Sequence, residues 1–167
     1  MEGYGLTETV AVLAVNTLRE NREGSIGKAI PGVEVKIIDE GGREVPVGEE
    51  GEIAVAGNTL MNGYYHLDDP KPFIEIEGKR FLKTGDLGKM DADGFIYFLS
   101  RVKRLIKKKG INVYPLSIEK LVSGLDGVEE SAYLCETYKG YDDTVLYVKL
   151  RPGVDKVDAE KRIMDAL

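Results

Sequence analysis

The segment Gly3-Tyr-Gly-Leu-Thr-Glu8 is the first stretch of the sequence whose residue types could do chemistry. Two glycines around an aromatic residue let the backbone pass close to a flat ligand, with the Tyr4 ring as a stacking surface. Thr7 adds a hydroxyl donor and Glu8 a hard oxygen ligand, a pair that suits phosphate and Mg²⁺. The structural alternative is a glycine-rich turn in which Thr7 caps a helix. A dinucleotide fingerprint is excluded because it needs a third glycine after a full strand.

A second candidate is the tripeptide Thr84-Gly-Asp86. A short turn of this composition would present the carboxylate of Asp86 in a fixed direction. A carboxylate accepts two hydrogen bonds from a vicinal diol such as a ribose. The alternative is an ordinary Asx turn with no ligand, and the tripeptide alone does not decide between the two.

The most distinctive stretch is Ser100–Gly110, in which six of eleven residues are basic. We interpret it as a hinge followed by a loop that handles anionic groups. Arg101 would supply a planar fork for phosphate or ribose, and Gly110 would let a narrow ligand pass. The alternatives are a solvated basic face at a domain boundary and a nucleic-acid patch. The net acidity of the chain and the lack of interleaved aromatic residues argue against nucleic acid.

The remaining reactive residue types are scarce. Cys135 is the only cysteine, which excludes an intramolecular disulfide and a cysteine-cluster metal site. His66 is the only histidine, which argues against a histidine metal centre or a Ser-His-Asp relay. We expect Cys135 to be buried in a strand and His66 to be exposed in a loop.

Length and charge limit the organisation of the chain. It has 167 residues and a net charge of −6, enough for one domain or slightly more. No apolar run approaches the ~18 residues of a membrane span, and no secretory signal is evident, so we predict a cytoplasmic protein. Residues 1–100 carry 10 basic and 18 acidic side chains, whereas residues 101–167 carry 13 basic and 11 acidic ones. The change at residue 101 predicts a boundary there.

Hydrophobic periodicity indicates strands before this boundary and a mixture of strands and helices after it. Expected strands are 33–39, 51–55 and 95–99, with turns at 41–42 and 91–94. After residue 101, Pro115 should open a helix that ends near Gly124 or Gly127. Strands are expected at 128–135 and 144–150, and Asp155 or Asp158 should cap a final helix.

The order and spacing of six motifs are more specific than any one of them. Taken together they resemble the adenylate-forming superfamily, which comprises acyl-CoA synthetases, nonribosomal adenylation domains and firefly luciferases. Within it the chain looks most like a fatty acyl-CoA synthetase. The motifs are 3–8, 24–27 with 31–32, 51–52, 62–65, 84–86, and Arg101 with 107–115.

The resemblance implies an α+β fold: a small, distorted β-barrel-like subdomain over 1–100, then a hinge and a small α+β C-terminal domain over 101–167. It also implies ATP-dependent activation of a carboxylic acid to an acyl-adenylate, followed by transfer to the thiol of CoA or of a carrier-protein pantetheine. ATP, AMP, Mg²⁺ and CoA would be the small molecules involved. We do not expect nucleic acid to be a binding partner, and the oligomeric state is left open.

Residue roles carried over from the family give the candidate site. Tyr4 would stack on adenine, Thr7 would bond the α-phosphate, Glu8 would hold Mg²⁺, and Asp86 would grip the ribose hydroxyls. Arg101 would contact ribose or phosphate.

Three further residues belong to the expected movement of the C-terminal domain. Lys103 would be the hinge between the two half-reactions. Lys107 and Gly110 would then face the active site and border the thiol channel. Ser100, Lys103 and Arg104 depart from the commonest family pattern at the hinge.

Some family motifs are not matched in this sequence. The Ser/Thr/Gly-rich phosphate loop and the C-terminal catalytic lysine have no counterpart here. The chain therefore looks like a fragment of a longer ligase, and we expect it to be inactive alone. Rival interpretations are a carrier-protein synthetase or nonribosomal adenylation domain, and a non-catalytic interaction module on the same scaffold. The acid itself is not identified.

Overall fold

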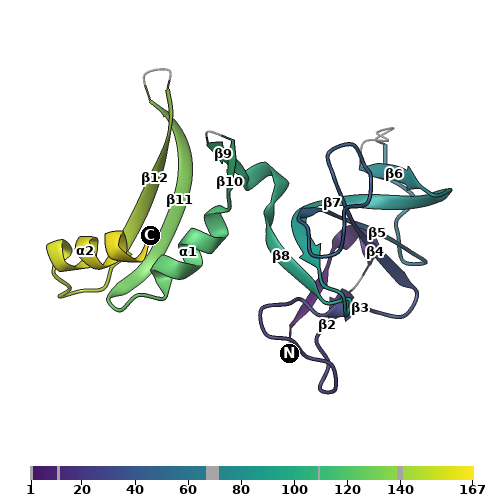
Figure 1. Cartoon of the computed structure of the whole chain (residues 1–167), viewed down its shortest axis with the longest axis horizontal. Helices are drawn as coiled ribbons and strands as arrows, with labels where there is room; N and C mark the ends of the chain where they lie inside the picture. Colours follow the sequence, from purple (N-terminus) through teal and green to yellow (C-terminus); the bar gives the residue numbers. More distant parts are fainter. Residues whose placement is uncertain (1, 11, 67–71, 109, 139–140) are drawn as a thin grey trace. The chain divides into compact units, whose positions relative to one another are not determined.

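The computed structural model describes residues 2–10, 12–66, 72–108, 110–138 and 141–167 (Figure 1). The chain folds as two compact units, Met1–Lys103 and Arg104–Leu167, called unit 1 and unit 2 below. The charge change in the sequence falls a few residues before this division. The assignment of residues 1–100 and 101–167 to named parts of an adenylate-forming enzyme stays a prediction.

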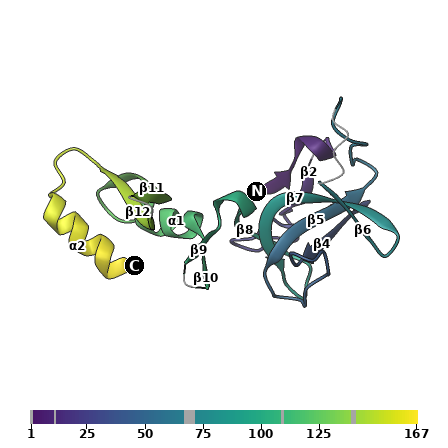
Figure 2. The same cartoon turned by 90° about the horizontal axis from the view of Figure 1, so that it is seen from above.

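Among its described residues, unit 1 forms a three-stranded and a five-stranded antiparallel sheet. Figure 2 shows β4, β5 and β7, which are neighbouring strands of the five-stranded sheet, as one curled layer, in agreement with the barrel-like expectation. The expected strands at 33–39, 51–55 and 95–99 are confirmed. In chain order the elements are β1 (Gly3–Gly5), the 3₁₀ helix η1 (Thr7–Thr9), β2 (Val12–Val15), β3 (Lys28–Ala29), β4 (Val33–Ile38), β5 (Gly51–Gly57), β6 (Phe73–Ile76), β7 (Lys79–Met90) and β8 (Ile96–Arg101).

The prediction that Thr84-Gly-Asp86 forms a short turn is wrong. The tripeptide lies inside the long strand β7, where the pairing with β5 changes register. Gly85 has φ +74°, a conformation that glycine adopts without strain, so the strand bulges and continues. The hydroxyl of Thr84 accepts the amide N–H of Asp86 at 3.1 Å. The bulge is thus stabilised by the threonine and not by an Asx turn of the aspartate.

The core of unit 1 lies against the curled sheet. Its main cluster combines Leu13 and Ala14 of β2 with residues of β4, β5, β7 and β8, including Ile53, Leu82 and Ile96. Each fully buried aliphatic side chain of this kind stabilises the fold by ~1.5–3 kcal/mol. This cluster fixes β1, β7 and β8 relative to one another, and these three strands carry the candidate site.

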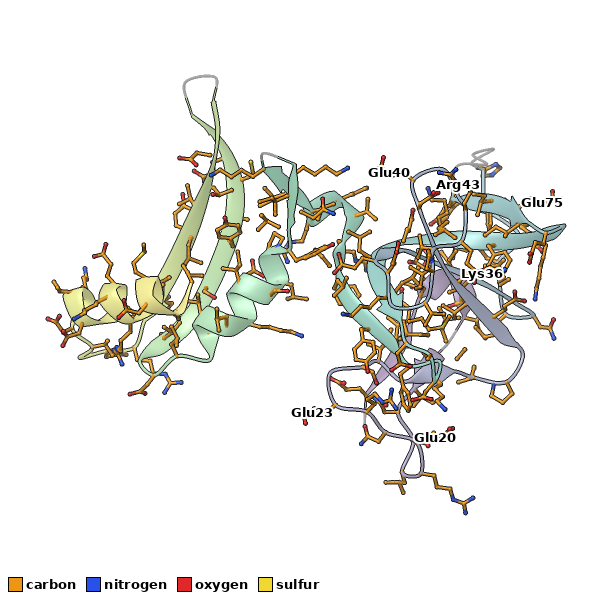
Figure 3. All side chains as sticks on the ribbon, viewed as in Figure 1. Glu20, Glu23, Lys36, Glu40, Arg43 and Glu75 are labelled. Carbon is orange, nitrogen blue, oxygen red and sulfur yellow. The ribbon has the colours of Figure 1, made fainter. Side chains whose placement is uncertain are left out.

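The acidic surface of unit 1 is visible on its loops. Figure 3 shows Glu20 and Glu23 on the loop between β2 and β3, and Glu40 and Arg43 on the turn after β4. Arg43 pairs with Asp39 at 2.9 Å, as is common for exposed charges at a turn. Such exposed pairs contribute at most ~1 kcal/mol each, so the core and not the charge pattern determines the stability of this unit.

Unit 2 is an α+β arrangement, as expected. Pro115 occupies the first turn of α1, Gly124 follows its end, and Asp155 caps α2 by accepting the amides of Val157 and Asp158. Val122, Val128 and Ile163 are buried in its core. The elements are β9 (Ile106–Lys108), β10 (Ile111–Val113), α1 (Pro115–Ser123), β11 (Val128–Tyr138), β12 (Tyr141–Leu150) and α2 (Lys156–Ala166); the 3₁₀ turn η2 (Val102–Arg104) spans the division between the units.

The prediction that Cys135 is buried is wrong. Its strand, β11, extends beyond the helices that cover the base of the β11–β12 hairpin, and Cys135 is exposed (Figure 1). The alternating pattern identified the strand but not how far the helices reach along it. His66 is exposed, as expected. No helix among the described residues combines the length and the apolar character needed to cross a bilayer.

Candidate functional site

Three of the predicted nucleotide-binding residues meet in unit 1. The hydroxyl of Tyr4, on β1, donates a hydrogen bond of 2.6 Å to Oδ2 of Asp86, on β7. Nε of Arg101, the last residue of β8, lies 2.9 Å from the other carboxylate oxygen, Oδ1. The β7–β8 register places Asp86 directly opposite Arg101. We call Tyr4, Asp86 and Arg101 the carboxylate cluster.

The carboxylate of Asp86 is almost fully removed from solvent. Its side chain is 1 % exposed, whereas that of Arg101 is 55 % exposed. Oδ1 forms an ion pair with Arg101 but has no hydrogen-bond partner among the described residues. A buried oxygen without a donor is costly, and such a group calls for an explanation.

Burial determines the ionisation of this cluster. Desolvation raises the pKa of Asp86, and the hydrogen bond from Tyr4 and the charge of Arg101 offset this only in part. Desolvation also raises the pKa of Tyr4, and its hydrogen bond to Asp86 raises it further. The Tyr4 hydroxyl therefore remains protonated and donates to the carboxylate at neutral pH.

Glu8 belongs to a second group of residues. It lies in η1, and its Oε1 accepts a hydrogen bond of 2.8 Å from the hydroxyl of Tyr64. The backbone carbonyl of Glu8 accepts the amide N–H of Met61 at 2.8 Å. Thr7 is the exposed first residue of η1; the cap position is Leu6, so the alternative of a capping Thr7 is wrong. The structure thus joins the first motif to the segment 61–64.

The donor chemistry at Glu8 fits Mg²⁺ as it is carried by a nucleotide. Among the described residues, no three His, Cys, Asp or Glu side chains gather as a metal site. Mg²⁺ usually binds one or two carboxylates and completes its coordination with phosphates and water. Glu8 supplies one such carboxylate. The buried Oδ1 of Asp86 likewise fits a hydroxyl donor such as that of a ribose.

The segment that follows Arg101 differs from the expected loop. Lys103 lies in η2, a single 3₁₀ turn and not a long helix, next to the division between the units. Lys107 lies on β9, and Gly110, at φ +81°, precedes β10, so these residues belong to a short hairpin. Lys108 of this hairpin forms an ion pair with Asp143 of β12, with 3.0 Å between Nζ and Oδ1.

Sequence reasoning missed two supporting residues. Tyr64 lies in the motif 62–65 and Glu52 in the motif 51–52, but neither residue was predicted to have a role. Glu52 accepts the amide N–H of Gly85 at 3.0 Å and pairs with Lys83, so it supports the bulge below Asp86. These contacts join residues that lie far apart in the chain. The only signal for them was that both residues occur in the ordered motifs.

Comparison with known proteins shows what this arrangement is similar to. The sequence model described as AMP-binding enzyme matches residues 1–65. A long-chain-fatty-acid–CoA ligase of Salmonella typhimurium is 41% identical over 133 residues, which are 79% of this chain and 23% of the ligase. The chain belongs to the adenylate-forming superfamily.

Solved structures agree with this assignment. ATP-bound MatB from Rhodopseudomonas palustris has a TM-score of 0.86 and 32% identity, over 99% of this chain and 34% of MatB. O-succinylbenzoate coenzyme A synthetase from Bacillus subtilis, in complex with ATP and magnesium ion, has a TM-score of 0.81 and 29% identity over 99% and 34%. The chain thus spans about a quarter to a third of the length of the proteins that it matches.

Proposed function

We propose that this chain carries the nucleoside-binding part of an ATP-dependent, AMP-forming acid–thiol ligase. The protein would activate a fatty or related carboxylic acid as an acyl-adenylate and transfer the acyl group to CoA. The observation that carries this proposal is the carboxylate cluster. It joins an aromatic ring, a buried carboxylate oxygen without a hydrogen bond, and a guanidinium, from three strands.

Each member of the cluster would have one task. The Tyr4 ring offers a flat surface for adenine, and its hydroxyl holds Oδ2 of Asp86. Oδ1 would accept a hydroxyl of the ribose, for which a carboxylate is a strong, charge-assisted acceptor. The guanidinium of Arg101 brings positive charge to the same place and would contact ribose or phosphate.

The other predicted residues would act on the phosphates and on the thiol. Thr7 would bond the α-phosphate, and Glu8 would hold Mg²⁺, which supplies charge stabilisation when the nucleotide is bound. Lys103 would be the hinge, and Lys107 and Gly110 would border the thiol channel after a domain rotation.

CoA is the preferred acceptor because the relative and the synthetase named above are CoA ligases by name. Their acids differ, from long-chain fatty acids to O-succinylbenzoate, so the acid stays open. Two alternative functions compete with this proposal: transfer of the acyl group to a carrier-protein pantetheine, and a non-catalytic role. A cytoplasmic location is part of the same proposal.

We expect the 167-residue chain by itself to form no acyl-adenylate at an appreciable rate. The sequence has no match to the family phosphate loop or to the catalytic lysine motif. Groups that stabilise charge in a transition state are typically worth ~10²-fold or more each. ATP–pyrophosphate exchange with mixed fatty acids and Mg²⁺ should therefore not exceed that of the Asp86→Ala and Lys103→Ala variants.

Exchange well above both variants would contradict the expected inactivity. A failure to bind any adenine nucleoside, measured separately, would contradict the proposed function itself.

A further inference from the structure

We infer that Glu52 is a positioning residue for the proposed nucleoside site: it holds the bulge of β7 from which the carboxylate of Asp86 would reach a ribose. This inference rests on the proposed function and deepens it, since Glu52 itself would not touch the ligand. It would act through the backbone amide of Gly85, the residue before Asp86.

The strands β5 and β7 lie side by side in the curled sheet (Figure 2), but their ladder is interrupted at this bulge. On one side of the interruption Ala54 pairs with Lys83, and on the other side Glu52 pairs with Leu87. One residue of β5 therefore stands opposite three residues of β7, 84–86. The backbone groups of these three residues need partners outside the ladder, because an unpaired backbone group in a sheet is costly.

Two side chains supply these partners. Oε1 of Glu52 accepts the amide N–H of Gly85 at 3.0 Å. The hydroxyl of Thr84 donates to the carbonyl of Ile53 at 2.8 Å and accepts the amide N–H of Asp86 at 3.1 Å. Since hydrogen bonds to an ionised acceptor are the stronger ones, we expect the bond from Gly85 to Glu52 to contribute most to the shape of the bulge.

The position of Asp86 depends on this shape. Asp86 is paired with Arg101 of β8, and it directly follows Gly85 at the bulge. Gly85 has φ +74°, and glycine adopts other backbone conformations just as readily, so its own geometry does not fix the direction of the chain. A shift of about 1 Å in Asp86 would weaken its hydrogen bonds to a ligand diol. Glu52 would prevent that shift.

The two oxygens of Glu52 have separate partners, which hold the side chain in place. Oε1 binds Gly85, whereas Oε2 lies 3.1 Å from Nζ of Lys83, and the side chain is only 15 % exposed. Its charge also reaches Asp86. Desolvation is the main influence that raises the pKa of Asp86, and the charge of Glu52 raises it further. Glu52 is therefore close enough to Asp86 for its removal to be felt there.

The test measures the affinities of adenosine and 2′,3′-dideoxyadenosine for the full 167-residue chain by amide NMR titration. In the unaltered chain, the diol should make adenosine bind at least about tenfold more tightly than the dideoxy analogue. Glu52→Ala should reduce this ratio to about threefold or less, because Asp86 is no longer held in place. The affinity for the dideoxy analogue should stay within about twofold, since that ligand does not use Asp86.

Two further variants separate the hydrogen bond from the charge. Glu52→Gln loses the charge but keeps an oxygen within reach of Gly85, so it should retain most of the ratio. Glu52→Asp keeps the charge but is shorter by one methylene, so it should lower the ratio as Glu52→Ala does. Glu34→Ala is the matched control, because Glu34 of β4 also pairs with a lysine of β7, Lys79, away from the bulge. It should leave the ratio unchanged.

An unchanged ratio in Glu52→Ala and Glu52→Asp would overturn the inference and leave the nucleoside site standing, even if urea unfolding showed a loss of stability. Equal losses for both ligands would also overturn it, because Glu52 would then support the fold and not the diol contact. A ratio lost in Glu52→Gln as well would exclude the hydrogen bond to Gly85 as the cause. If the unaltered chain binds neither ligand, the proposed function fails and the inference fails with it.

Discussion

Asp86→Asn is expected to stabilise the chain at pH 7 by about 1 kcal/mol while weakening adenosine binding at least about tenfold. Asparagine keeps the shape of the side chain and can still accept from Tyr4. It removes a buried negative charge whose desolvation is not fully offset by Tyr4 and Arg101. It also removes the charge that makes Oδ1 a strong acceptor for a ribose hydroxyl.

The sign of the stability change follows from the raised pKa of Asp86. A carboxyl group with a folded-state pKa above its unfolded value stabilises the fold fully at pH values below the unfolded pKa. This stabilisation is lost as the pH rises through the folded-state pKa. The advantage of Asp86→Asn should therefore be greatest at neutral pH and should vanish near pH 3. Urea unfolding followed across this range measures it.

Asp39→Asn is the matched control with the opposite sign. Backbone hydrogen bonding by Arg43 is the main influence that lowers the pKa of Asp39. Its ionised form is therefore the one that stabilises the fold, and Asp39→Asn should lower stability at pH 7. Destabilisation by Asp86→Asn at pH 7, or unchanged adenosine affinity, would contradict the account of the carboxylate cluster.

Gly27→Ala is expected to destabilise unit 1 by roughly 3–5 kcal/mol. Gly27 has φ +91°, and an added Cβ would lie 2.0–2.3 Å from backbone atoms of Val15 and Asn16. The carbonyl of Gly27 also accepts the amide N–H of Ile96, at the start of β8. The substitution would therefore disturb both β2 and the strand that ends at Arg101.

Gly24→Ala is the control for backbone conformation alone. Gly24 has φ +78°, but an added Cβ would meet nothing within 4 Å. Its cost should be about 1–2 kcal/mol, the strain of a left-handed alanine. Urea unfolding followed by the NMR signals of Ile53 and Ile96 reports on unit 1. Equal losses for the two variants would show that the close approach at Gly27 does not limit the fold.

The elements that could be predicted from sequence depend on neighbouring residues. Pro115 begins α1 because its fixed φ and missing N–H suit the first helical turn. Asp155 caps α2 because its carboxylate reaches the amides two and three residues later. The alternating residues of β4 predicted a strand for the same local reason, although the burial along β4 does not alternate and its last two residues, Ile37 and Ile38, are both buried.

The elements that were predicted wrongly depend on distant partners. Thr84-Gly-Asp86 has turn composition, yet pairing of β7 with β5 and β8 holds it inside a strand. Cys135 fits a buried alternation, but the covering helices do not extend to it. Lys107 and Gly110 belong to a hairpin because Ile106–Lys108 pairs with Ile111–Val113.

The candidate site could be predicted only as a set of residues. The motifs named Tyr4, Asp86 and Arg101, and the structure brings them together. Their mutual contacts could not be predicted, since Tyr4 and Asp86 are 82 residues apart. The pairing of Glu8 with Tyr64, 56 residues apart in the chain, could likewise not be predicted. The roles assigned to Thr7, Lys103, Lys107 and Gly110 stay predictions.

The most direct test of the nucleoside site is an amide NMR titration of the chain with adenosine and with 2′,3′-dideoxyadenosine. Adenosine should produce saturable shifts at the amides of Tyr4, Gly85, Asp86 and Arg101, and the dideoxy analogue should bind at least about tenfold more weakly. The same response to both ligands, no response to either, or shifts confined to β11 and β12 would contradict the assignment.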